Sequence, residues 1–295
     1  MKLNNKRTML VGLAFLSICA FWQMYDTVIP KILTETFHLD EALSGAIMAA
    51  DNVLALFLLP FFGALSDRTN TRLGRRMPYI LAGTALAVVL MNLLPVFDNG
   101  YAAAPGATKL TMFVITLGLL LIAMGTYRSP AVALMPDVTP KPLRSKANAI
   151  INLMGAVGGI LYLIVAAVLY PNSRIEGLAH IDYQPLFIVV SAVMAVSVLA
   201  LFLTTNEPKL SAAEKEYEAA HPEQQLAEEE PDGSEELPKA VKKSLAFILL
   251  SIALWYVGYN AVTTWWSTYV ARVMGQGLGG ASTCLLIATG GAIVS

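Results

Sequence analysis

The chain has 295 residues, of which 56% are hydrophobic and 14% charged, with a mean hydropathy of +0.60 and a net charge of −1. A soluble domain carries about 25% charged residues, so this composition excludes a soluble globular protein. The basic residues are scattered over loops, and no nucleic acid partner is expected. The fold class predicted is an all-α, multi-pass membrane protein.

Apolar runs of about 20 residues are long enough to cross the hydrocarbon core of a bilayer. Seven such runs are followed by an eighth that reaches the last residue of the chain: 8–29, 43–65, 77–97, 110–133, 147–170, 185–204, 244–267 and 280–295. With the N-terminus inside, fifteen of the 20 lysines and arginines fall in cytoplasmic segments. Because cytoplasmic loops are enriched in these residues, the sequence predicts a multi-pass protein of the plasma (inner) membrane with a cytoplasmic N-terminus.

The first run carries a polar and aromatic group, with Trp22, Gln23 and Tyr25 as candidate substrate-binding residues beside Asp26. An aspartate at the bilayer centre costs about 2.5–3.5 kcal/mol on insertion scales. Asp26 is therefore expected to face the protein interior or a water-filled cavity. The alternative is an interfacial carboxylate close to Lys31.

The second run places Asp51 at roughly the same depth as Asp26. Two carboxylates at one depth can share a proton or a cation, because each charge makes ionisation of the other harder. Asp26 and Asp51 are the candidates for proton coupling. The alternative is that one of them only caps a helix or lines an aqueous vestibule.

A basic loop joins the second and third runs, and its charges are predicted to form a cytoplasmic gate with the loop that follows the fourth run. Gly63 and Gly74 allow close backbone approach, and Asp67 can pair with an arginine. The candidate gate residues are Gly63, Asp67, Arg68, Arg72, Gly74, Arg75, Arg76, Asp137 and Arg144.

The fourth and fifth runs contain further candidates for substrate binding. Arg128 is the only cation inside a run, which makes it either a partner for substrate or counter-ion, or a snorkelling residue near the membrane surface. Asn148 and Asn152 are four residues apart and can hydrogen-bond a ligand or another helix. Gly155, Gly158 and Gly159, in the same run, are expected to pack tightly against a neighbouring helix.

The composition changes in segment 205–243, which is acidic and lacks an apolar run. Such a segment cannot bury enough surface to fold, so it is predicted to be a solvated cytoplasmic linker with a short helix at 211–220. It separates an N-terminal six-helix lobe, residues 1–204, from the start of a C-terminal lobe, residues 244–295.

The seventh run has a polar, aromatic face that includes Tyr256 and Asn260. Sugars bind such faces, because their hydroxyl groups take hydrogen bonds while their C–H patches lie on rings. The alternative is the aromatic belt at the membrane interface, which suits Trp265 and Trp266 well.

The order Gly-x-x-x-Asp-Arg-x-x-x-Arg-x-Gly-Arg-Arg, beginning at Gly63, resembles the loop between helices two and three of the major facilitator superfamily. Two segments are similar to the corresponding parts of sucrose–proton symporters: the one around this loop and the one around L-M-P-D-V-T-P-K-P-L-R-S-K-A-N-A. The related glycoside–pentoside–hexuronide cation symporters share the same overall sequence pattern. The resemblance implies two six-helix lobes, a midplane sugar site and cation coupling by alternating access. Ala55 and Leu59 replace the carboxylates of the sodium site in melibiose-type permeases. Val132 replaces the arginine of plant sucrose carriers, one turn after Arg128.

The function predicted is secondary active transport of a sugar or glycoside, coupled to a cation, with the proton favoured. The alternative is a truncated or non-transporting membrane protein, a sensor or an inactive fragment. No HExxH, GxSxG or Ser/His/Asp arrangement is present, so no enzyme, cofactor or metal is expected, and membrane lipid is the other partner. In fold terms we expect a major facilitator helical bundle, the first six-helix lobe plus helix 7 and part of helix 8. Residues 1–295 by themselves are expected to insert without transporting.

Overall fold

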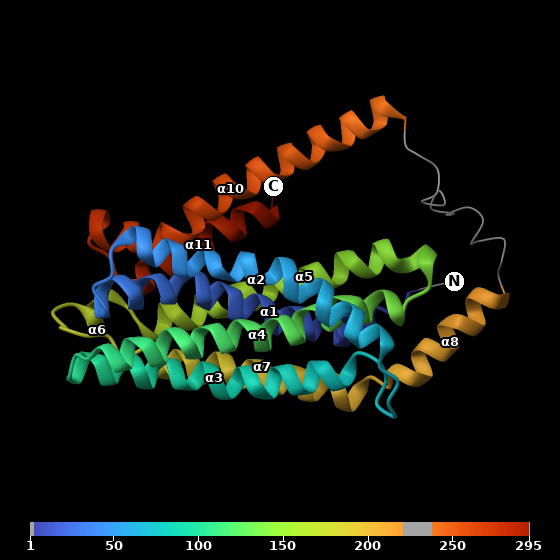
Figure 1. Cartoon of the computed structure of the whole chain (residues 1–295), viewed down its shortest axis with the longest axis horizontal. Coiled ribbons are helices and arrows are strands. Elements are labelled where there is room, and N and C mark those ends of the chain that lie inside the picture. The colour runs from blue at the N-terminus through green and yellow to red at the C-terminus, as the bar shows by residue number, and fades with distance from the viewer. Residues whose placement is uncertain (1–2, 221–237, 295) are drawn as a thin grey trace.

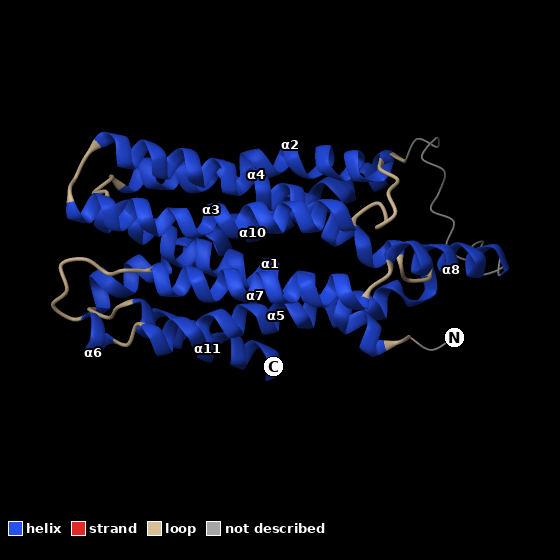
Figure 2. Ribbon diagram, turned by 90° about the horizontal axis from the view of Figure 1, so that it is seen from below, coloured by secondary structure: helices blue, strands red, loops and turns tan. Residues whose placement is uncertain are grey.

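The computed structural model describes residues 3–220 and 238–294, and these ranges fold into helices without a β-strand (Figures 1 and 2). Seven of the described helices are long and apolar enough to cross a membrane. This confirms the prediction of an all-α, multi-pass membrane protein. The elements are α1 Asn5–Lys31, η1 Ile32–Thr36, α2 Glu41–Arg68, α3 Met77–Ala103, α4 Ala107–Asp137, η2 Lys141–Leu143, α5 Arg144–Leu169, α6 Asn172–Ile175, α7 Gln184–Thr204, α8 Glu207–Ala220, α10 Lys239–Met274 and α11 Leu278–Val294.

Helix α1 is the centre of the bundle and packs against α5, α7 and α10. One of its buried stripes contains Ala14, Phe21 and Val28, which recur every seven residues and are fully buried. Seven residues are close to two helical turns, so these side chains lie on one face. Around α1, helix α3 packs against α4 and α7, α2 against α4, and α11 against α5.

The contact between α1 and α5 depends on glycine. A Cβ atom on Gly158 would lie 2.0 Å from the carbonyl oxygen of Leu16, and one on Gly155 would lie 2.9 Å from Sγ of Cys19. Small residues let membrane helices approach this closely. The predicted packing role is confirmed for Gly155 and Gly158, whereas a Cβ on Gly159 would make only an ordinary contact, 3.8 Å from Oε1 of Gln23.

Helix α1 does not end at Pro30 but passes through it and continues into the π-helical turn η1. Proline removes one backbone donor, and a π turn shifts the register of the hydrogen bonds that follow. The Thr34 hydroxyl donates to the Pro30 carbonyl oxygen at 2.9 Å, a side-chain hydrogen bond within the same turn. Burial of Ile32 and Leu33 against the bundle keeps the chain helical over this turn.

Helix α10 touches the bundle over only part of its length. Its residues 241–262 are exposed, and burial begins only further along the helix, at Ser267 and Thr268. The helix diverges from the bundle toward the end that holds the loop 69–76 (Figure 1). We call this the basic end, and the end that holds the α10–α11 turn the opposite end.

The acidic segment differs from the expected solvated linker. Its described part contains α8, which begins at Glu207 and is longer than the predicted helix at 211–220. Two of its acids are buried, since Glu207 is 2% exposed and Glu214 is 7% exposed. The expectation that these acids serve solvation is wrong for both residues, because each contacts the helical bundle. Residues 221–237 of the predicted linker lie outside the described residues.

Candidate functional site

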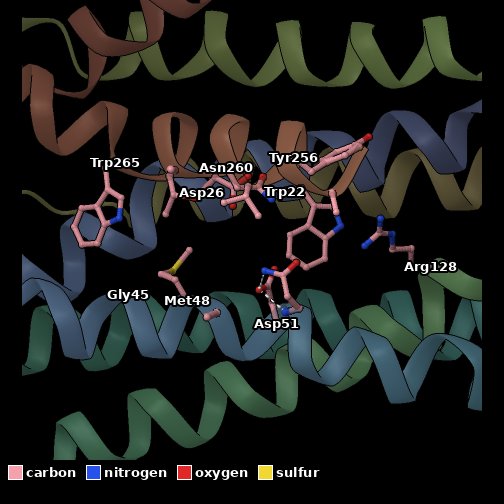
Figure 3. Close-up of a pocket in the computed structure, with 15 residues that line it drawn as sticks. Trp22, Asp26, Gly45, Met48, Asp51, Arg128, Tyr256, Asn260 and Trp265 are labelled. Carbon is pink, nitrogen blue, oxygen red and sulfur yellow. Dashed lines mark hydrogen bonds between the residues drawn. The ribbon is translucent and has the colours of Figure 1, made fainter. Parts of the chain in front are cut away.

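A cavity of about 690 Å³ lies between α1, α2, α4 and α10 (Figure 3). Its walls are polar and aromatic at one end and more apolar toward Trp265 at the other. Six residues predicted for binding or coupling line it: Trp22 and Asp26 from α1, Asp51 from α2, Arg128 from α4, and Tyr256 and Asn260 from α10.

An arginine and a tryptophan form the cationic corner of the cavity. The guanidinium carbon of Arg128 lies 5.5 Å from the centroid of the Trp22 ring, within the range of a cation–π contact. The indole of Trp22 is held edge-on against Phe21 and Tyr25, at 5.2 and 5.3 Å between ring centroids. Its Nε1 is buried and has no hydrogen-bond partner among the described residues.

The two carboxylates belong to different walls of the cavity, Asp26 to α1 and Asp51 to α2 (Figure 3). Oδ1 of Asp51 accepts hydrogen bonds from the backbone N–H and the side-chain amide of Asn52, at 2.5 and 2.7 Å. Within the described part of the chain, neither carboxylate forms an ion pair with Arg128. The cavity therefore holds acidic and basic groups that remain available to a ligand or a cation.

Four other predicted binding residues do not line this cavity. Gln23 points toward α5, and Tyr25 is 1% exposed with a hydroxyl that has no partner among the described residues. Asn148 and Asn152 are exposed on α5. The structure does not bring these four side chains to Asp26 and Arg128, and a binding role for them stays a prediction.

Several lining residues were not among the predicted site residues. Gly45, Met48 and Asn52 form one face of α2, and Thr264 and Trp265 lie on α10. Residues 45, 48 and 52 have the spacing of one helical face. From the sequence, this face can be assigned to a cavity only after Asp51 is known to face one. In the sequence, Trp265 also fitted the aromatic belt at the membrane interface. Only the packing of α10 places it at the cavity.

At the basic end, Arg76 connects three helices. Its Nε donates to Oδ2 of Asp137 at 2.7 Å, and its guanidinium also forms an ion pair with Asp67. Arg75 adds a contact of 3.5 Å to Asp137. Arg76 is 5% exposed, and buried ion pairs of this kind matter most when several donors and acceptors are satisfied together. The structure thus joins the ends of α2, α3 and α4 through the predicted charges.

The other predicted gate residues have different positions. Nη1 of Arg76 lies 3.4 Å from the Gly63 carbonyl oxygen, whereas Arg68 and Arg72 are exposed. Arg144 donates to the carbonyl oxygens of Thr139 and Pro136 at 3.0 and 2.9 Å. It also pairs with Glu214 of α8 at 3.2 Å, so its acidic partner comes from the segment expected to be a linker.

Glu207 is a residue of this cluster that the sequence did not reveal. Its carboxylate accepts the backbone N–H groups of Arg75 at 2.7 Å, Arg76 at 2.9 Å and Met77 at 2.9 Å. These are free donors at the start of α3, where a negative charge is favoured by the helix dipole. The carboxylate occupies the space beside Gly74, whose φ of +113° suits glycine. Glu207 therefore fixes α8 to the first turn of α3.

At the opposite end, hydrogen bonds join α10 and α11 to the earlier helices. The Ser267 hydroxyl donates to the Thr27 carbonyl oxygen at 2.8 Å. Gly277 N–H donates to Asn172 Oδ1 at 2.8 Å, and Gly279 N–H donates to the Tyr170 carbonyl oxygen at 3.0 Å. An ion pair between Arg272 and Glu41 lies at the same end. The bundle is thus closed here, while α10 is exposed toward the basic end.

These features define a polytopic membrane protein with a polar chamber between its helices. The family model of the Major Facilitator Superfamily matches residues 11–295, and the chain belongs to this superfamily. Membership places it among transport proteins rather than enzymes, as the sequence predicted.

Relatives with curated names include a sucrose transport protein and a solute carrier. The chain is 30% identical to the sucrose transport protein SUC3 of Arabidopsis thaliana over 141 residues, 43% of this chain and 23% of the relative. It is 25% identical to the human solute carrier family 45 member 3 over 194 residues, 64% of this chain and 34% of the relative. The chain therefore spans about a quarter to a third of the curated relatives that it matches.

Two solved structures share the fold. A D-xylose-proton symporter superposes with a TM-score of 0.63 at 14% identity, covering 97% of this chain and 65% of the other. The xylose transporter XylE from E. coli, in an inward open conformation, gives a TM-score of 0.58 at 16% identity, covering 88% and 62%. At this identity the likeness establishes the helical architecture alone.

The cluster at the basic end leads to a graded prediction. Asp137 is 18% exposed and contacts both Arg75 and Arg76, whereas Asp67 is 56% exposed. Exposed ion pairs contribute about 0–1 kcal/mol, and removing one partner of a buried pair costs about 3–5 kcal/mol. We expect Asp137→Asn to lower the thermal stability of the purified chain more than Asp67→Asn. Equal losses would show that Arg76 does not depend on its buried partner.

Proposed function

We propose that this chain serves in the secondary active transport of a sugar or glycoside, by proton-coupled symport with alternating access. The observation that carries the proposal is the cavity that brings Trp22, Asp26, Asp51 and Arg128 opposite Tyr256 and Asn260. Relatives named as sucrose transport proteins and the structural likeness to a D-xylose-proton symporter support the sugar and the proton.

The chemistry of the cavity suits a neutral, hydroxyl-rich ligand. The Trp22 ring, which lines the cavity, offers a flat surface for the C–H face of a pyranose. Arg128 supplies donors in a fixed geometry, and the Asn260 amide both donates and accepts. Small-molecule sites typically have mostly apolar walls and a small number of precisely placed polar groups. A glycoside is the substrate class that uses all of these groups.

A proton is the coupling ion that the carboxylates support best. Asp26 and Asp51 are free of ion pairs within the described part, so either can take up and release a proton as the cavity changes access. Two nearby carboxylates favour one shared proton over two charges.

We also propose an orientation of the chain in the membrane and a division of the chain into domains. The basic end is cytoplasmic, since Lys and Arg concentrate there, and the membrane is the plasma (inner) membrane. Residues 1–204 form one lobe, 205–243 link it through α8, and 244–295 begin a second lobe. Closure at the opposite end and divergence of α10 from the bundle at the basic end (Figure 1) then correspond to an inward-facing state, the state named for the similar xylose transporter structure.

The test is counterflow of labelled glucosides, galactosides and pentoses in proteoliposomes that contain the complete gene product. We expect Trp22→Ala to abolish saturable counterflow of the preferred sugar. Trp255→Ala is the matched control, because Trp255 is 62% exposed and does not line the cavity. Loss of counterflow in both variants, or in neither, would contradict the assignment of the cavity. Saturable binding without counterflow in the parent protein would favour a sensor instead.

A further inference from the structure

A carboxylate unrelated to the cavity lies deep in the opposite end of α3. Asp98 is fully buried, and neither of its oxygens has a hydrogen-bond partner among the described residues. The Thr36 hydroxyl lies beside it but outside ordinary hydrogen-bond geometry. An ionised carboxylate without donors costs several kcal/mol in such surroundings. Asp98 therefore requires either a proton or a cationic neighbour.

The neighbour is a histidine from the loop that precedes α7. Nε2 of His180 lies 3.9 Å from Oδ2 of Asp98 and 2.7 Å from Oδ1 of Asn99. His180 also lines a second cavity, of about 360 Å³, at the opposite end of the bundle. Water can thus reach the imidazole while the carboxylate behind it remains buried. Burial lowers the pKa of His180, and the charge of Asp182 offsets part of this effect.

The connection between α5 and α7 carries His180 and also Tyr170 and Asn172, which accept the N–H groups of Gly279 and Gly277 in the closure. Asn99 Nδ2 donates to Oδ1 of Asp182 at 2.7 Å, and the Tyr170 hydroxyl donates to the Asp182 carbonyl oxygen at 2.8 Å. The Tyr170 carbonyl oxygen in turn accepts the N–H of Gly279. Three hydrogen bonds, which use different atoms of Asp182 and of Tyr170, thus connect the residue beside Asp98 to the start of α11.

Other charged or titratable groups surround the pair on each element that packs there. The Lys31–Glu35 ion pair, 3.3 Å long, comes from α1 and η1. The remaining groups are His38 from the α1–α2 connection, Tyr101 from α3, Tyr170, Glu176, Asp182 and Tyr183. Lys31 is paired with Glu35, so it does not neutralise Asp98.

We propose that Asp98 and His180 form a proton-binding site whose single proton stabilises the closure of the bundle at the opposite end. With one proton the buried pair has no net charge, whichever residue holds it. When the closure opens, water reaches both groups and each titrates independently, so that the imidazole loses its proton near its ordinary value of about pH 6.5. Above about pH 6.5 the open form therefore has no proton on the pair, and closing must take one up. By linkage, acidification from pH 8 to pH 6 favours the closed form.

The test measures the closure directly and does not depend on transport. Spin labels are placed at Ala103→Cys and Met274→Cys, two exposed positions at the ends of α3 and α10, with Cys19 and Cys284 replaced by alanine. Distance distributions of the full chain in detergent micelles are recorded between pH 5 and pH 8. The shorter-distance population is expected to grow on acidification to pH 6 and then to remain constant.

The variants are expected to differ in how acidification changes the closed population. Asp98→Asn leaves only the imidazole, which is charged when exposed to acid, so acidification below about pH 6.5 should now open the bundle. His180→Gln leaves only the carboxyl group, so the closed population should continue to grow below pH 6. His38→Gln, a histidine of the same cavity, should behave as the parent. A parent without pH dependence, or an Asp98→Asn variant that still closes in acid, would overturn the proposal.

Discussion

Replacing Asp26 with asparagine is expected to abolish uphill accumulation of the substrate while sugar-for-sugar exchange continues. Asparagine keeps the size and hydrogen-bonding capacity of the side chain but cannot take up a proton. Asp26 on α1 lines the cavity together with Asp51 on α2. Within the described residues, neither carboxylate forms an ion pair. Exchange needs only the binding site and alternating access, whereas accumulation also needs the proton-motive force.

The measurement compares accumulation under an imposed proton gradient with counterflow in the same vesicles that contain the complete gene product. Asp51→Asn is the matched variant, because Asp51 lies on the facing wall and already accepts two hydrogen bonds from Asn52. We expect it to reduce accumulation less than Asp26→Asn does, since those donors stabilise its charge. Normal accumulation in both variants would place proton coupling on another residue.

The sequence was sufficient for those parts of the structure that depend on local pattern. Runs of about 20 apolar residues located the spans, and the charges of Asp67 and Arg76 indicated a cluster because a short loop keeps them close. Asp26 and Arg128 could be assigned to a polar interior because charges in a span are costly on the lipid side. Packing was predictable at Gly158, where small residues permit close contact.

The remaining features depend on contacts between distant segments. Glu207 lies in an acidic segment, and its role follows from N–H donors 130 residues or more earlier in the chain. Asn148 and Asn152 have the spacing of a polar face, yet the rotation of α5 about its axis is set by glycine contacts with α1. The first apolar run stops at residue 29, just before Pro30, whereas burial of the following turn preserves the helix beyond it. No local pattern encodes these outcomes.

The second large effect is expected from Glu207→Gln, which should unfold the purified chain at a markedly lower temperature. The carboxylate is 2% exposed and accepts the backbone N–H groups of Arg75, Arg76 and Met77. Hydrogen bonds to a charged acceptor contribute about 1.5–3 kcal/mol each, and a buried donor left without an acceptor costs about 1–3 kcal/mol. Glutamine offers one oxygen and directs an amide toward the remaining donors. A loss of about 3 kcal/mol is expected from these terms.

Thermal unfolding in detergent micelles, followed by near-ultraviolet circular dichroism, measures this effect, with Glu216→Gln as the control on an exposed acid of the same helix. Gly74→Ala provides an independent route to the same contact. The added Cβ would lie 2.3 Å from the Glu207 carboxyl carbon and would force a side chain onto φ +113°. Because both substitutions disrupt one contact, their effects should fall short of additive in the double variant. Full additivity, or equal losses from Glu207→Gln and Glu216→Gln, would show that the carboxylate does not cap α3 in the membrane protein.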